Sequence, residues 1–218
     1  MEIQWYGHSC FRLSSQAGFT VVTDPFDQSV GYPRPTFSAD LVTTSHDHFD
    51  HNHYRIVQGA PKLANRPGTV APGELASGVG VRGVASFHDE VEGRRRGPNT
   101  IFLFELDGVR VAHLGDLGHR LSVKQVAEIG PVDVLLVPVG GTYTIDAQGA
   151  FEVCQAVQPK IAVPMHYKTD VCRVDLGPVE PFLRLCPKVE RPNTNRLTLT
   201  AEGLKGLSPW KAVVLNYR

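Results

Sequence analysis

Apolar and polar residues alternate through most of the first half of the chain, which predicts short β-strands. A β-hairpin is predicted over residues 100–114, because Asp107-Gly108 supplies a turn between two runs rich in Phe, Leu and Val. Further strands are predicted at residues 3–13, 20–23, 41–44 and 79–87. Stretches 25–39 and 59–78, rich in Pro and Gly, are expected to be long surface loops.

In the second half the apolar positions take a helical spacing between buried strands. A helix is predicted over residues 122–129, with Ser122 as its cap and Gly130-Pro131 as its end. A second helix over residues 146–157 ends before Pro159. The other predicted elements are strands at 132–139, 161–164, 196–200 and 211–215 and a short helix at 179–185. This order predicts layered sheets with helices outside, in one α/β domain over residues 1–218.

The amino-acid composition indicates which binding partners and which cellular compartment to expect. Lys plus Arg and Asp plus Glu both number 22, so the formal charge is zero and no nucleic-acid partner is expected. The N-terminus has no signal-peptide pattern, and the longest apolar runs, such as 132–139, are too short to cross a membrane. The four cysteines form no C-x-x-C pair, which favours reduced thiols. We therefore expect a cytoplasmic protein without membrane contact.

Ten residues, TSHDHFDHNH at positions 44–53, contain four histidines and two aspartates. In an extended segment alternate side chains share a face, so His46, His48 and Asp50 can point the same way, whereas His51 needs a turn to join them. The segment follows an apolar strand, and sites are commonly built where strands end. Imidazoles with a carboxylate and no thiolate suit zinc, iron or manganese.

A metal shell needs further ligands from elsewhere in the chain. His88, Asp116 and His166 each follow a strand-like run. Four strand ends carrying His or Asp can therefore converge on one edge of a sandwich, which predicts a metal site there.

Four motifs occur in the order H-x-H-x-D-H, an isolated His, an Asp within Gly-Asp, and a late His. In this order the chain resembles the metallo-β-lactamase superfamily. It is most similar to a compact branch of metal-dependent hydrolases that includes bacterial L-ascorbate-6-phosphate lactonase. That branch is marked here by GHSCF at 7–11, Asp24-Pro25 and PMHY at 164–167. Over residues 1–170 the resemblance implies a four-layer αββα sandwich, the metallo-β-lactamase fold.

The resemblance also implies a ligand set for two divalent ions. His46, His48 and His88 would hold one metal, Asp50, His51 and His166 the second, and Asp116 would bridge both. Two ions about 3.5 to 4 Å apart can hold a hydroxide at neutral pH, which attacks a carbonyl or a phosphorus. Zinc is the metal expected first, with manganese, iron or nickel as alternatives. We expect hydrolysis of a small ester, lactone or phosphodiester, with an anionic substrate favoured.

Several residues near the expected ligands are candidates for supporting roles. Asp24 can accept a hydrogen bond from a ligand imidazole, or simply form the turn before a proline. His8 can contact substrate or lie behind the ligands, and His119 is a candidate proton donor to the leaving group. Tyr143 and Lys168 can orient an oxyanion or a phosphate, with surface or packing roles as the alternative.

Other polar features are interpreted without a catalytic role. His53 and His113 are predicted to be structural. The cationic run 94–96 lies between glycines, which favours a solvated loop over an anionic substrate site. The apolar segment 211–217 can be an edge strand that pairs with a second copy, so a homo-oligomer is an open alternative.

Three other functions remain open at the level of sequence. The first is nucleic-acid phosphodiester cleavage, which the balanced charge and the lack of an inserted domain disfavour. The second is di-iron redox chemistry, which would need an electron-transfer partner that the chain does not contain. The third is a metal-binding protein without turnover.

Overall fold

The computed structural model describes residues 1–33, 35–71 and 75–217. Its first sheet has six strands in the order β13-β1-β2-β3-β4-β5. Their bounds are β1 Glu2–Gly7, β2 Cys10–Ser14, β3 Thr20–Thr23, β4 Leu41–Thr43, β5 Lys62–Ala64 and β13 Arg196–Thr198.

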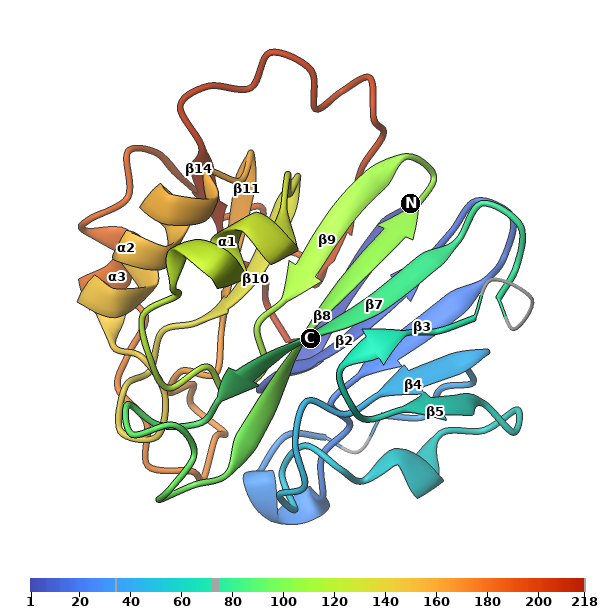
Figure 1. Cartoon of the computed structure of the whole chain (residues 1–218), viewed down its shortest axis with the longest axis horizontal. Coiled ribbons are helices and arrows are strands. Elements are labelled where there is room, and N and C mark those ends of the chain that lie inside the picture. Colours follow the sequence, from blue (N-terminus) through green and yellow to red (C-terminus); the bar gives the residue numbers. More distant parts are fainter. Residues whose placement is uncertain (34, 72–74, 218) are drawn as a thin grey trace.

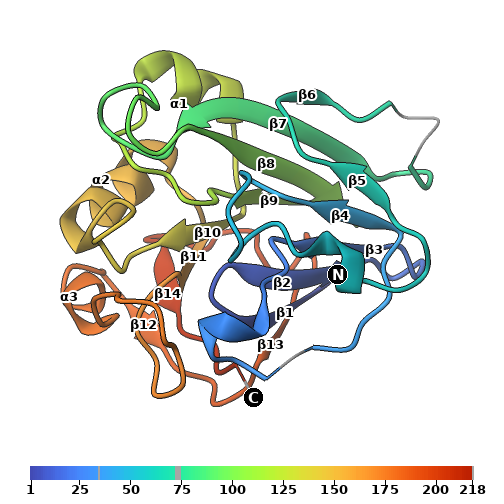
Figure 2. The same ribbon diagram turned by 90° about the horizontal axis from the view of Figure 1, so that it is seen from below.

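The second sheet has eight strands in the order β12-β14-β11-β10-β9-β8-β7-β6. Their bounds are β6 Gly68–Thr69, β7 Gly80–Phe87, β8 Pro98–Leu106, β9 Val109–His113, β10 Val134–Pro138, β11 Ile161–Met165, β12 Val189–Glu190 and β14 Lys211–Val213. The two sheets face each other, as the view from below shows (Figure 2).

The helices α1 (Val123–Ile129), α2 (Ala147–Val157) and α3 (Glu180–Leu183) gather on the outer side of the second sheet (Figure 1). Both longer helices begin where the sequence predicts. Ser122 caps α1 in a capping box with Gln125, and the Asp146 side chain accepts a hydrogen bond from the backbone of Gly149 at the start of α2. Among the described residues no helix is long and apolar enough to cross a membrane.

The outer layer on the first sheet is built differently. Alternate residues of β3 and β4 face opposite sides, so Val21 and Leu41 join the main core while Val22 and Val42 join a second apolar cluster. This cluster is covered by loops and by the 3₁₀ helices η1 (Gln28–Val30) and η2 (Tyr54–Ile56). The αββα sandwich is therefore confirmed, but its fourth layer holds short 3₁₀ turns in place of α-helices.

Three predictions of local structure are wrong in detail. The predicted strand 3–13 is two antiparallel strands, because positive φ angles at Gly7 (103°) and His8 (52°) reverse the chain. The stretch 25–39 is not a surface loop, since Phe26, Val30, Tyr32 and Phe37 are buried in it; residue 34 lies outside the described residues. The stretch 59–78 contains β5 and β6, and residues 72–74 lie outside the described residues.

The C-terminal strand is also not the edge that the sequence suggested. β14 lies between β11 and β12 and pairs in parallel with both. Its backbone groups are thus already used in the sheet, and a pairing role with a second copy loses its basis.

The cysteines are free thiols, as predicted. Cys10, Cys154 and Cys172 are buried, and Cys186 is partly exposed.

Strand direction decides where the polar residues gather. β1 and β3 both run antiparallel to β2, and β4 is parallel to β3, so all three end at one edge of the first sheet. In the second sheet β7 and β9 are both antiparallel to β8, and β10 and β11 run parallel to β9. The chain leaves each of these strands in the same direction, so the loops after them can meet.

Candidate metal centre

The loops after six strands bring their His and Asp side chains into one buried cluster. His8 follows β1, Asp24 follows β3, the segment 46–51 follows β4, His88 follows β7, Asp116 follows β9 and His166 follows β11. All of the predicted ligands except the partly exposed His48 are at least nine-tenths buried. The predicted ligand residues thus lie together, although they are far apart in the sequence.

Two groups of donor atoms stand out within the cluster. One ring nitrogen from each of His46, His48 and His88 lies within 4.8 Å of the others. In the second group, donor atoms of Asp50, His51 and His166 lie within the same distance, and His8 is a fourth member.

Asp116 lies between these two groups. Its Oδ2 is 3.2 Å from His88 Nε2 and 3.2 Å from His166 Nε2, and its Oδ1 is 3.3 Å from His51 Nε2. The His46 Nε2 atom is 3.9 Å from Asp116 Oδ2. A single carboxylate therefore contacts imidazoles of both groups.

Asp24 and Ser45 fix the tautomers of two imidazoles. The Ser45 hydroxyl donates to Asp24 Oδ2 over 2.6 Å, so its oxygen accepts from His46 Nδ1 at 2.9 Å. His51 Nδ1 donates to the same Asp24 oxygen at 2.8 Å. With a proton held on Nδ1, both imidazoles direct Nε2 toward the cluster, where it can ligate a cation. Asp24 thus does what one of the two sequence interpretations assigned to it.

Buried donor atoms without a hydrogen-bond partner show whether a cation fits the cluster. His46 Nε2, His51 Nε2 and Asp116 Oδ1 are buried and have no hydrogen-bond partner among the described residues. Buried polar atoms without partners are costly. His51 Nε2 lies 3.3 Å from Asp116 Oδ1 and His46 Nε2 lies 3.9 Å from Asp116 Oδ2, so these atoms gather around one carboxylate. Nitrogen and carboxylate oxygen are the donors that zinc and similar divalent ions accept, so the cluster fits such ions.

Burial keeps several imidazoles neutral, as metal ligation requires. It lowers the pKa of His46 to about 3 and the pKa of His8 to about 4, and it also lowers the pKa of His88. Burial opposes ionisation of Asp116 too, but His166 and His51 outweigh it and hold its pKa well below the usual range.

His51 differs from its neighbours. Burial disfavours its charged form, but the carboxylates of Asp116 and Asp50 outweigh burial and raise its pKa well above the usual value. In the metal-free protein a second proton, on Nε2 of His51, is therefore favoured, and an incoming cation must displace it.

Replacing Asp24 by Asn is expected to weaken metal binding about 10- to 100-fold, the usual cost of losing a partner behind a ligand. The amide cannot accept from both Ser45 and His51 as the carboxylate does, so the His51 tautomer is no longer fixed. Titration with a divalent ion, followed by calorimetry, measures the change. Equal affinities for a folded Asp24→Asn and the wild type would contradict this role.

His119 does not join the cluster, and its role as proton donor stays a prediction. Its Nδ1 donates to the carbonyl of Arg120 at 2.7 Å, and its Nε2 accepts from the backbone N–H of Phe87 at 3.2 Å. Both ring nitrogens bond to local backbone in this structure, so proton donation to a leaving group requires one of these bonds to open.

Lys168 and Tyr143 lie outside the cluster as well. The Lys168 ammonium is exposed and donates to the carbonyl of Val174 at 3.2 Å. The Tyr143 ring packs under the guanidinium of Arg96, 5.3 Å from its centroid. These contacts match the surface and packing alternatives for both residues.

The cationic run is part of an ordered turn. The Asp89 carboxylate accepts four backbone N–H groups of this turn, from Val91, Gly93, Arg95 and Arg96. Although burial opposes ionisation, these donors lower the pKa of Asp89 to about 2. The Arg96 guanidinium then bonds to the carbonyls of Thr142 and Tyr143 and ties this turn to the loop after β10.

Two histidines, His113 and His53, are interpreted as structural. His113 hydrogen-bonds to backbone, and His53 lies at the start of a 3₁₀ helix. His113 is fully buried; its Nε2 donates to the carbonyl of Ser9 at 2.8 Å and its Nδ1 accepts from the N–H of Gly115. His53 is the N-cap residue of η2.

No sequence motif points to Asn99, which holds the loop of Asp116. Asn99 Oδ1 accepts from the Asp116 N–H at 3.0 Å, and its Nδ2 donates to the carbonyl of Leu114 at 3.0 Å. Ser45 was also missed, although its place beside His46 is a local signal. No residue near Asn99 in the sequence indicates that its side chain contacts Asp116, 17 positions away.

Gly118 marks a close approach of two loops in the site. A Cβ at this position would collide with the backbone of His88 and Asp89. Gly118→Ala is therefore expected to displace His88 and weaken metal binding at least tenfold. A suitable control is Gly80→Ala, because neither Gly80 nor Gly118 has a positive φ and a Cβ at Gly80 meets only Glu105, at an ordinary contact distance of 3.5 Å. If metal titration gave Gly118→Ala the wild-type affinity, the contact would not govern the position of His88.

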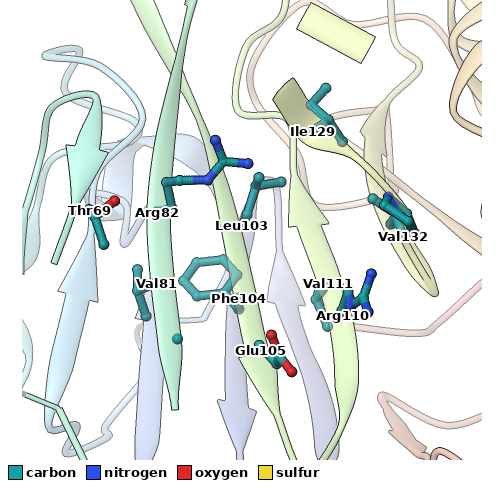
Figure 3. Close-up of a pocket in the computed structure, with 12 residues that line it drawn as sticks. Thr69, Val81, Arg82, Leu103, Phe104, Glu105, Arg110, Val111, Ile129 and Val132 are labelled. Atoms are coloured by element: carbon teal, nitrogen blue, oxygen red, sulfur yellow. The ribbon is translucent and has the colours of Figure 1, made fainter. Parts of the chain in front are cut away.

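The surface of the protein has cavities outside the cluster of His and Asp ligands. One of about 580 Å³ is lined by Glu90 and by residues from 118–120 and 141–149. Another, of about 330 Å³, lies beside β7, β8 and β9 near α1, and Arg82, Leu103 and Ile129 are among the residues that line it (Figure 3). Neither cavity is lined by a member of the two donor groups.

Comparison with known proteins identifies the family. Residues 2–166, which are 165 of the 218, match the Beta-lactamase superfamily domain. A UPF0173 metal-dependent hydrolase of Thermoplasma acidophilum is 31% identical over 222 residues, covering 88% of this chain and 97% of the relative. A solved structure from Thermotoga maritima, described as a putative Zn-dependent hydrolase of the metallo-β-lactamase superfamily, is 43% identical. It has a TM-score of 0.79 and covers 98% of this chain and 97% of that one. Sequence and fold together show that this chain belongs to the metallo-β-lactamase superfamily.

Proposed function

We propose that the protein is a hydrolase that holds two divalent metal ions and cleaves a small ester, lactone or phosphodiester. The observation that carries the proposal is the position of Asp116, whose two oxygens lie 3.2 to 3.3 Å from imidazoles of both donor groups. The names of the relatives agree with a metal-dependent hydrolase.

In this proposal each donor group holds one ion. His46, His48 and His88 form the first position, Asp50, His51 and His166 the second, and Asp116 belongs to both. Bound divalent ions supply a water of lowered pKa as nucleophile and polarise the substrate oxygen. Zinc is the first choice for both positions, and the Thermotoga maritima relative is described as Zn-dependent.

The chain's own residues prepare the site for this chemistry. Asp24 and Ser45 hold a proton on Nδ1 of His46 and His51, so both rings direct Nε2 toward the metal positions. Asn99 holds the backbone of Asp116, which keeps the carboxylate between the two groups. Burial of these residues lowers the local dielectric and strengthens each electrostatic contact.

The substrate is proposed to be small. The cavity of about 580 Å³ begins at Gly118, two residues after Asp116, and its size falls in the range of small-molecule sites. Arg120 lines it together with the acids Glu90 and Asp146, so the lining carries charges of both signs and selects neither charge class of substrate. A nucleic-acid substrate finds less support, because the chain has a formal charge of zero and offers no excess of cations for a polyanion.

The test is to load the purified protein with zinc or manganese, measure metal per chain, and assay a panel of lactones, carboxylic esters and phosphodiesters. Turnover of one class that is lost on chelation and restored by metal supports the proposal. Cleavage of single-stranded RNA or DNA, with no turnover of small substrates, would favour the nuclease alternative. Two bound metals without turnover of any substrate would favour a binding protein.

A further inference from the structure

We propose that His8 is a ligand of the second metal position, in addition to Asp50, His51, His166 and Asp116. This inference rests on the proposed dinuclear centre. It gives His8 a direct role that the motif at 46–51 and its later partners do not contain.

The first observation is the place of His8 among the donor atoms. A ring nitrogen of His8 lies within 4.8 Å of donor atoms of Asp50, His51 and His166, and the donor atoms of the first group also lie within 4.8 Å of one another. Its ring centroid is 4.3 Å from that of His166 and 4.9 Å from that of His51. The first group shows the same spacing, with 4.5 Å between His46 and His48 and 4.7 Å between His46 and His88. The cluster therefore contains two sets of three imidazoles.

The second observation is the distance between His8 Nε2 and Asp50 Oδ2, which is 3.1 Å. Metal–nitrogen bonds of about 2.0 to 2.1 Å place two ligands of one ion about 2.9 to 3.4 Å apart in tetrahedral or octahedral geometry. The distance from Asp116 Oδ2 to His88 Nε2 and to His166 Nε2, 3.2 Å in each case, lies in the same range. His8 is thus spaced from Asp50 as the expected ligands are spaced from Asp116.

The third observation is the backbone that holds His8. His8 has a φ of 52° and His166 a φ of 51°, a left-handed conformation that costs energy in residues other than glycine. The carbonyl of His8 accepts hydrogen bonds from the Trp5 indole at 3.1 Å and from the backbone N–H of His166 at 3.2 Å. These bonds fix the strained turn and connect it directly to an expected ligand.

The alternative is a histidine that only donates a hydrogen bond to Asp50. Cobalt(II) separates the two roles, because the ring N–H proton of an imidazole bound to this paramagnetic ion gives a strongly shifted NMR signal. The probe is cobalt(II) at saturation, with metal per chain measured in parallel. The variants are His8→Gln, whose amide can still donate to Asp50, and His8→Gly, which suits the positive φ. His53→Gln is the matched control, since His53 lies outside both donor groups.

The wild type is expected to bind two cobalt ions, and His8→Gln is expected to lose one shifted N–H signal and to bind its second ion at least tenfold more weakly. The His53→Gln control is expected to keep every signal. If the second ion is lost altogether, His8→Gly with ¹⁵N-labelled imidazole decides, and a shifted signal from the labelled ring supports ligation.

An unchanged set of shifted signals in a two-cobalt His8→Gln protein overturns the proposal and leaves the dinuclear centre intact. The same holds if labelled imidazole restores no shifted signal of its own. A wild-type protein that binds fewer than two cobalt ions overturns both the role of His8 and the proposed centre.

Discussion

Replacing Asp116 by Ala or Asn is expected to lower bound metal from two ions per chain to one or fewer and to reduce turnover at least about 100-fold. Loss of a partner behind a ligand usually costs about 10- to 100-fold, and Asp116 contacts three imidazoles directly at 3.2 to 3.3 Å. Asn preserves the shape but removes the charge, and one of its two heteroatoms can no longer donate an electron pair.

The measurement combines metal analysis, circular dichroism and steady-state kinetics on the substrate found by the panel. Asp47→Asn is the matched control, because Asp47 is an exposed acid in the same ten-residue segment and belongs to neither donor group. A folded Asp116→Ala that hydrolyses substrate at the wild-type rate would remove Asp116 from the proposed mechanism.

Metal removal is the second large effect. The metal-free protein is expected to melt at a lower temperature than the loaded one, because ions bind the assembled site and not the dispersed ligands of the unfolded chain. Free metal at 100 times Kd adds about 2.7 kcal/mol, which for a chain of this size raises Tm by about 5 to 10 °C. Thermal melts at several free-metal concentrations, set with a chelator, give the slope. A Tm that stays constant while metal content falls to zero would exclude a preformed two-metal site.

The metal-free protein is also expected to lose stability as the pH falls from about 6.5 to about 4. His8 and His46 have pKa values of about 4 and about 3 when folded, below their ordinary value of 6.5. In this window the unfolded chain binds more protons than the folded one, so the free energy of unfolding decreases as the pH is lowered, by a few kcal/mol in order of magnitude.

The pKa shift of His51 changes the free energy of unfolding with pH in the opposite direction. Its raised pKa means that the folded protein binds the extra proton, so this contribution is complete below about pH 6.5 and is lost as the pH rises through the folded pKa. The two effects together predict a metal-free protein that is most stable near neutral pH. Urea denaturation between pH 4 and pH 9 measures the curve, and a stability that rises steadily toward pH 4 would contradict burial of neutral His8 and His46.

The sequence pattern correctly predicted the elements that depend on residues only a few positions apart in the chain. The Asp107-Gly108 turn, the Ser122 capping box and the Asp146 cap each depend on residues within a few positions, and all three are present. Local pattern failed between β1 and β2, where alternation continues across the turn at Gly7 and His8. The strands β5, β6 and β12 were missed because they have only two or three residues and too little periodicity to read.

The ligand residues were identified from sequence because metal binding restricts them to a few side-chain types, and His46, His48, Asp50 and His51 share one segment. Sequence could not assign the remaining polar groups. His119 is only three residues after Asp116, yet both of its nitrogens bond to backbone, while Asn99 is distant in sequence and holds Asp116 in place.

The amino-acid sequence alone determined the chemistry of the site, because donor atoms are properties of individual residues. Only the tertiary structure decided which donors meet, since that depends on strand direction. β1, β4, β7, β9 and β11 all end at one rim, and this common direction places His8 beside Asp50, and Asp116 between two sets of imidazoles. Contacts between residues as far apart as His8 and His166 result from the pairing of whole strands, which no local pattern contains.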